Sequence, residues 1–94
     1  MPAALTVRCL CCGYQTLSQP GSFGLCPVCW WQDDGQDDAD AGVVRGTVNG
    51  RLSLTAAREN FIRYGAADPR FCHRVRRPLP AEFSSKYPGR NLQI

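Results

Sequence analysis

CLCC at residues 9–12 and CPVC at residues 26–29 decide the fold of this chain. Thirteen residues separate the two stretches, so their cysteines follow the pattern C-x2-C-x13-C-x2-C. Two thiolates separated by two residues on a tight turn span one edge of a tetrahedron, and a second such turn supplies the opposite edge. The pattern predicts one structural Zn²⁺ ion per chain, bound by four cysteines: Cys9, Cys12, Cys26 and Cys29.

Four thiolates suit iron as well as zinc, and we expect zinc because structural CxxC pairs are usually zinc sites. A chain of 94 residues buries a limited share of its surface, so a bound metal is a useful source of folding free energy. Residues 1–8 lack the basic and apolar segments of a signal peptide, and no apolar run approaches membrane-spanning length. We therefore expect a cytoplasmic protein without membrane contact, whose six cysteines are reduced and not joined in disulfides.

Short β-prone segments surround the cysteine pairs. Residues 6–8, 14–17 and 30–32 are expected to be strands, and Gly13 follows the first pair where the turn needs a positive φ. The adjacent Trp30 and Trp31 are expected to divide their roles. One packs over the metal site and the other faces the helical part of the chain.

The second half of the chain favours helices. Ser53 is a good N-cap for a helix over residues 54–64, which Gly65 should terminate. Asp68-Pro69 is a second start signal, for a short helix through about Val75. One face of the longer helix is expected to point into the protein, and its residues are Leu54, Ala57, Phe61 and either Tyr64 or Gly65, with Ile62 beside them. The opposite face, with Arg58, Glu59 and Arg63, is expected to point outward.

These elements predict an α+β fold in which a small zinc-ribbon β lobe packs against one longer and one shorter helix. The expected single domain, residues 1–94, comprises the zinc-ribbon lobe (6–32), an acidic loop and linker (33–50), the helical part (53–77) and a loosely ordered tail (84–94). Residues 42–50 are a loop or a weak hairpin with Asn49-Gly50 at its tip.

Charge is distributed unevenly along the chain. Residues 1–44 carry one Arg and five Asp, whereas residues 45–94 carry ten basic and three acidic residues. The acidic loop does not fit a calcium-binding register, because Gly35 is at the wrong offset and no glutamate closes the loop. The loop is either solvated or a contact patch for a basic partner, and the residues of that patch are Asp33, Asp34, Asp37, Asp38 and Asp40.

A basic cluster lies in the second predicted helix. Arg70, Arg74 and Arg77 recur at helical spacing, so with Arg76 they form a basic patch that can face phosphates or carboxylates. Three interpretations stay open: a solvated face that pairs with the acidic loop, a nucleic-acid site, and a site for an acidic protein.

Two cysteines remain outside the predicted metal site. Cys11 lies inside the first pair, and Cys72 lies beside His73 on the short predicted helix. One interpretation makes both cysteines free thiols and His73 a surface residue. The other makes Cys72 or His73 a metal ligand, or pairs Cys72 with Cys11 as a redox switch or sensor. A nucleophilic cysteine needs a base and an orienting group around it, and neighbours on one helix diverge, so no enzymatic activity is expected. No phosphate-binding loop or catalytic triad is visible either, and we expect no small-molecule substrate.

The sequence resembles the bacterial cysteine-rich CPCC family. The resemblance rests on CLCCGY at residues 9–14, CPVCW at 26–30, WQDDG at 31–35, the 53–65 segment and VRRPLP at 75–80. It implies a small zinc-binding protein and no catalytic residues. The proline that gives the family its name is Leu10 here, which changes a turn preference without removing a metal ligand.

These observations predict a small non-enzymatic zinc protein that acts as a protein-interaction module. An immunity or antitoxin factor, whose acidic loop plugs the basic cleft of a toxin, is suggested by fold-level analogy. The alternatives are a zinc-ribbon protein that binds nucleic acid through the basic patch, and a thiol or metal sensor that uses Cys11 and Cys72.

Overall fold

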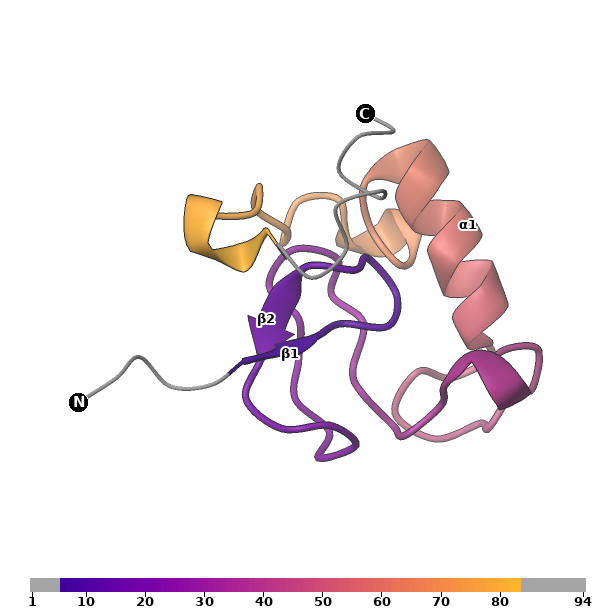
Figure 1. Ribbon diagram of the computed structural model, residues 1–94. Coiled ribbons are helices and arrows are strands. Elements are labelled where there is room, and N and C mark those ends of the chain that lie inside the picture. Colours follow the sequence, from indigo (N-terminus) through magenta and orange to yellow (C-terminus); the bar gives the residue numbers. More distant parts are fainter. Residues whose placement is uncertain (1–5, 84–94) are drawn as a thin grey trace.

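A computed structural model describes residues 6–83, and the predicted tail over residues 84–94 lies outside this part of the chain. The longest element is the helix α1 (Leu54–Tyr64). Two short strands, β1 (Val7–Arg8) and β2 (Gln15–Leu17), form an antiparallel sheet, as Figure 1 shows. Three single 3-10 turns complete the elements of the described part: η1 (Asp38–Asp40), η2 (Pro69–Phe71) and η3 (Pro80–Glu82). The fold is therefore a small α+β fold.

The β structure is smaller than the sequence predicted. Val7 pairs with Leu17 and Arg8 with Gln15, with an irregularity in register between the two pairs. The expected third strand over residues 30–32 is reduced to one antiparallel bridge between Leu25 and Gln32. Residues 42–50 are loop and turn, closed by a bridge between Val44 and Ser53.

Helix α1 has the bounds that its capping residues predicted. The Ser53 hydroxyl accepts a hydrogen bond from the backbone N–H of Ala56 at 3.1 Å, which satisfies one of the free donors of the first turn. Gly65 ends the helix with φ = 77°, and its N–H donates to the Phe61 carbonyl. This left-handed end residue is favourable because glycine has no Cβ to clash. In the part of the chain that the structure describes, no helix is long and apolar enough to cross a membrane.

The inward face of α1 is narrower than predicted. Leu54 and Ala57 are fully buried and Phe61 packs partly against the core, whereas Ile62 is 82% exposed. Arg58 does not point away from the protein as expected, because its Nε donates to the Leu10 carbonyl at 2.8 Å. This bond anchors the helix to the first cysteine pair.

The predicted second helix starts where expected, but its predicted extent through Val75 is wrong. Asp68 caps the turn η2 as expected, by accepting a hydrogen bond from the Arg70 N–H, but the helical structure ends at Phe71. Helices this short are held by tertiary packing of an apolar face. Phe71 and Val75 are only half-buried, and the N–H of Arg76 donates to the Pro27 carbonyl at 3.1 Å instead of continuing a helix.

The core lies around the cysteines, and the chain after α1 closes over it. The N–H of Ala67 donates to the Cys29 carbonyl at 2.7 Å. Further on, η3 lies against β2, and Phe83 makes an edge-to-face contact with Tyr14 at a ring-centroid distance of 5.2 Å. The segment from Ala67 to Phe83 therefore joins the helix to both cysteine pairs.

Candidate metal centre

The first cysteine pair lies on a turn that follows β1. The N–H of Cys9 donates to the Tyr14 carbonyl at 2.8 Å, and the N–H of Gly13 donates to the Cys9 carbonyl at 2.8 Å. Gly13 has φ = 88°, a left-handed conformation that glycine adopts without strain. The turn directs Cys9 and Cys12 into the core, where both are buried.

The second cysteine pair repeats this backbone pattern. The N–H of Cys26 donates to the Trp31 carbonyl at 2.9 Å, and the N–H of Trp30 donates to the Cys26 carbonyl at 2.8 Å. Trp30 occupies the place of Gly13 and also has a positive φ, 72°. The two turns are thus equivalent knuckles, except that the second places a bulky residue where the first has glycine.

The two knuckles bring their four sulfur atoms together. All four Sγ atoms, those of Cys9, Cys12, Cys26 and Cys29, lie within 4.8 Å of one another. Across the knuckles, the Cys9 and Cys29 sulfurs are 3.6 Å apart and the Cys12 and Cys26 sulfurs 3.7 Å. A tetrahedral ion with metal–sulfur bonds of about 2.3 Å places its sulfurs about 3.8 Å apart. The cluster therefore fits one tetrahedral metal ion.

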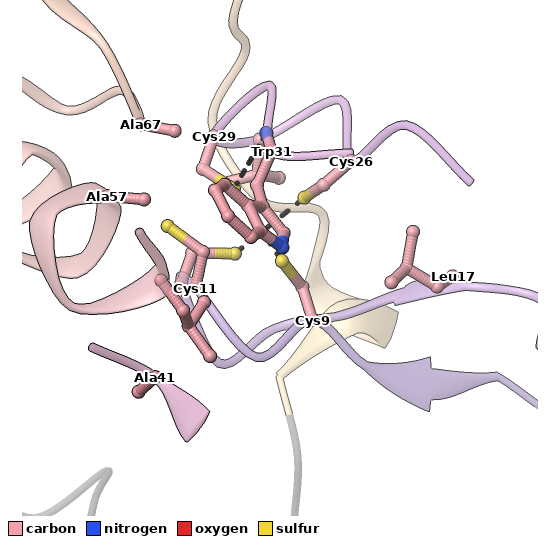
Figure 2. Packing of buried hydrophobic residues seen from close by; sticks show 12 residues of the cluster. Cys9, Cys11, Leu17, Cys26, Cys29, Trp31, Ala41, Ala57 and Ala67 are labelled. Atoms are coloured by element: carbon pink, nitrogen blue, oxygen red, sulfur yellow. Dashed lines mark hydrogen bonds between the residues drawn. The ribbon is translucent and has the colours of Figure 1, made fainter. Parts of the chain in front are cut away.

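The sulfurs receive hydrogen bonds from outside the cluster. The Thr16 hydroxyl donates to the Cys26 sulfur at 3.0 Å, and the backbone N–H of Trp31 donates to the Cys29 sulfur at 3.4 Å. Such donors stabilise negative charge on the thiolates and fix their orientation. Figure 2 shows Cys9, Cys26 and Cys29 around the ring of Trp31.

The close packing of the sulfurs perturbs their ionisation. The hydrogen bond with Cys26 raises the pKa of Cys12, and the same contact lowers the pKa of Cys26. Cys12 thus holds its proton more strongly, and Cys26 gives its proton up more readily. Four thiolates this close repel one another, so their full ionisation requires a cation at the centre.

The two tryptophans divide their roles as predicted. Trp31 is buried in the core with the cysteines. Trp30 is half-buried, and its ring lies 6.4 Å from that of Phe71, between centroids, in the segment that follows α1.

The remaining cysteines are not part of the four-sulfur group. Cys11 is buried within the first knuckle, where its side chain contacts Cys29 and raises the pKa of that thiol. Cys72 is exposed, with its sulfur 3.7 Å from the Tyr64 carbonyl. His73 is exposed. Within residues 6–83, the four knuckle cysteines form the only group of this kind that is arranged to hold a metal ion.

The predicted acidic patch is divided by the fold. Asp33 and Asp34 are each only 6% exposed, so they cannot form the exposed contact patch that the sequence suggested. Asp33 accepts hydrogen bonds from the backbone N–H groups of Gly21 at 2.6 Å and Gly35 at 3.2 Å. Asp34 accepts from the Gln36 N–H at 3.1 Å. These two buried carboxylates therefore fix the conformation of the loop by accepting hydrogen bonds from its backbone.

The other three aspartates lie at the surface around η1. Asp37 caps this turn by accepting from the Ala39 N–H at 2.9 Å. Asp38 pairs with Arg58 at 2.7 Å and Asp40 with Arg45 at 2.6 Å. Each arginine lowers the pKa of its partner carboxyl group through this contact. The acidic loop is therefore paired with Arg45 and Arg58, and not with the predicted basic patch.

The basic patch is not a helix face, because the helix that would have aligned it ends at Phe71. Arg70 pairs with Asp68 at 3.2 Å. Arg76 makes two hydrogen bonds to the Glu82 carboxylate, at 2.9 and 2.8 Å. Arg74 and Arg77 are exposed. Two of the four guanidinium groups are thus bound within the protein.

Sequence reasoning missed two polar residues that support the site. The hydroxyl of Thr16 contacts a cluster sulfur, and no spacing rule marks it. Asn49 donates from Nδ2 to the Gln32 carbonyl at 2.7 Å, and its Oδ1 accepts from the Gln32 N–H at 3.1 Å. Asn49 thereby joins the loop before α1 to the strand-like segment after the second knuckle.

Two facing cysteine knuckles with four buried sulfurs define a small protein with a candidate metal centre. The family model of the cysteine-rich CPCC proteins matches residues 7–82, so the chain belongs to this family, as its motifs indicated. Neither a curated protein nor a solved structure matches the chain.

Proposed function

We propose that the protein is a zinc-stabilised, non-enzymatic protein-interaction module of the zinc-ribbon type. The observation that carries the metal part is the cluster of four sulfurs at tetrahedral spacing, contributed by two equivalent knuckles. Zinc is the usual occupant of paired CxxC sites of this kind. Such a site requires reduced thiols, which favours a reducing compartment such as the cytoplasm.

The geometry supports a structural role for the ion. A catalytic zinc site keeps one position open for water or substrate, whereas four cysteine ligands close the coordination sphere. The cysteine cluster also forms the core against which Leu54 and Ala57 of α1 pack. The binding free energy of the metal is therefore available to folding.

The exposed apolar surface of the molecule supports the proposed interaction role. The surface carries exposed apolar side chains, among them Leu25, Val48 and Ile62, on a chain with a small core. The immunity or antitoxin hypothesis is one form of this role and rests on analogy alone. Nucleic-acid binding through the basic patch is less favoured, because Arg76 is bound to Glu82 and the helix that would have aligned the four arginines ends at Phe71.

Metal analysis of the full-length protein tests the structural role. We expect one zinc per chain, and a chelator is expected to abolish the cooperative unfolding transition. Cys26→Ser should lose both the metal and the transition. Cys72→Ser is the matched control, because Cys72 is exposed and outside the cluster, and it should retain both.

Other outcomes of this experiment have defined meanings. A coloured protein that contains iron would identify an iron site in the same four cysteines. If Cys26→Ser and Cys72→Ser bound metal equally well, the knuckle cysteines would not be the ligands and the proposal would fail.

A further inference from the structure

A partly apolar groove lies beside the second knuckle. It encloses about 330 Å³ and is lined by the apolar side chains of Leu25, Trp30, Val48, Leu52 and Phe71. We call this feature the Trp30 groove. Leu25 and Val48 are among the exposed large hydrophobic residues of the described chain, so the groove presents apolar surface to solvent.

Trp30 holds an unfavourable backbone conformation at this place. Its φ of 72° is one that residues with a Cβ rarely adopt, and the equivalent position of the first knuckle is Gly13. The knuckle backbone therefore does not require a side chain at this position. The indole instead forms a wall of the groove, with its ring at 49° to that of Phe71. Strained residues of this kind cluster at ligand-binding sites.

One exposed arginine lies at the rim of the groove. Arg70 lines it, with its guanidinium carbon 5.0 Å from the centre of the Phe71 ring and its side chain 72% exposed. Asp68 pairs with Nε of Arg70, and the two terminal nitrogens have no partner among residues 6–83. A partly apolar groove with this guanidinium group at its rim complements an apolar group next to a carboxylate.

We propose that the Trp30 groove binds an acidic segment of a partner protein that carries an aromatic or branched apolar side chain. The apolar side chain enters between Trp30, Phe71 and Val48, and a neighbouring carboxylate pairs with Arg70. This inference rests on the proposed interaction role and names its site and its partner.

A peptide fits the groove better than a nucleic acid does. The two rings are tilted and accompanied by aliphatic side chains, whereas base-stacking sites present aromatic faces along a continuous basic track. The groove offers one exposed cation, Arg70, and Arg76 is bound to Glu82. A single guanidinium group matches one carboxylate of a peptide more closely than a phosphate backbone.

Selection of peptides followed by an NMR titration tests the proposal on the full-length, zinc-loaded protein. A random peptide library is displayed on phage and selected against the immobilised protein. We expect the recovered peptides to share an aromatic or branched apolar residue beside Asp or Glu. A synthetic peptide of the recovered sequence is then titrated while the two indole N–H signals are followed. Binding in the groove should shift the signal of Trp30 and leave that of the buried Trp31 nearly unchanged.

Three variants locate the contact. Val48→Asp places a carboxylate in the groove and should weaken peptide binding at least about tenfold. Arg70→Glu reverses the rim charge and should weaken it about tenfold at low salt, with a smaller effect at high salt. Ile62→Asp is the matched control, because Ile62 is exposed and does not line the groove, and binding should stay within about twofold. All three keep the zinc content if they fold.

Several outcomes would overturn the inference. Recovered peptides without the shared pattern, or peptides whose binding survives Val48→Asp, would place the interaction elsewhere and leave the wider interaction role intact. A single-stranded oligonucleotide that shifts the Trp30 signal where the peptides do not would assign the groove to nucleic acid. No recovered peptide above background would reject the peptide site.

Discussion

The left-handed conformation of Trp30 leads to a quantitative prediction. We compare Trp30→Gly with Trp30→Ala. Both variants remove the contact with the Phe71 ring, which is worth about 0.5–1.5 kcal/mol for an aromatic pair. They differ in that alanine keeps the Cβ at φ = 72° and glycine removes it.

The magnitude follows from two opposing terms. Relief of the left-handed strain stabilises the glycine variant by about 1–2 kcal/mol. The greater freedom of glycine in the unfolded chain costs about 0.5–1 kcal/mol. Trp30→Gly should therefore be more stable than Trp30→Ala by about 1 kcal/mol. Because loss of the ring contact offsets the gain, Trp30→Gly itself should lie within about 1 kcal/mol of the wild-type protein.

Denaturant unfolding at a fixed excess of zinc measures these differences, since bound metal adds to the apparent stability. Gly46→Ala supplies an internal calibration. Gly46 has φ = 73°, and an added Cβ would meet no atom within 4 Å, so this variant isolates the backbone effect. If Gly46→Ala is destabilised while Trp30→Ala is as stable as Trp30→Gly, then strain at Trp30 is not the cause and the reasoning is refuted.

Two further predictions concern polar contacts within the metal lobe and its loop. Thr16→Val removes the hydroxyl that donates to the Cys26 sulfur and should lower zinc affinity about 10- to 100-fold in chelator competition. Thr16→Ser keeps a hydroxyl and should retain the affinity. Equal affinities for both variants would show that the hydroxyl does not support metal binding. Asp33→Ala leaves the Gly21 and Gly35 N–H groups without their buried acceptor and should cost about 1–3 kcal/mol of unfolding free energy. The surface variant Asp38→Ala should change it much less, because solvent screens the exposed ion pair with Arg58. A loss as large as that of Asp33→Ala would contradict the different roles assigned to buried and exposed aspartates.

The parts of the fold that the sequence predicted correctly are those set by local chemistry. The bounds of α1 follow from Ser53 and Gly65, which satisfy the free backbone groups at the two helix ends. The grouping of the four cysteines follows from their spacing, because each pair needs only one turn to present two sulfurs on the same side.

The parts that the sequence did not predict depend on contacts between distant segments. Asp68-Pro69 signals a helix start, but nothing in the local sequence shows that Arg76 donates its N–H to Pro27 and draws the chain out of the helix. Likewise, the sequence suggested that Asp33 and Asp34 lie in a solvated loop, although both are buried. Each carboxylate closes a local turn by accepting the backbone N–H of the residue two positions further on, which is Gly35 for Asp33 and Gln36 for Asp34. This tendency of aspartate to form such turns is the signal that sequence reasoning missed.

The placement of the four candidate metal ligands along the chain has a consequence for biosynthesis. Cys9 and Cys29, the first and last ligands, are 20 positions apart, and all four precede α1. Closing so short a loop costs little chain entropy, and chains emerge from the ribosome with their N-terminal part first. The ion can therefore be captured before the helix has been released, so that Leu54 later docks on a lobe that is already formed. If the proposed metal is needed to form this lobe, its scarcity during translation would leave newly made α1 without a surface to pack against. The cellular yield of folded protein would then depend on the supply of that metal at the moment of synthesis.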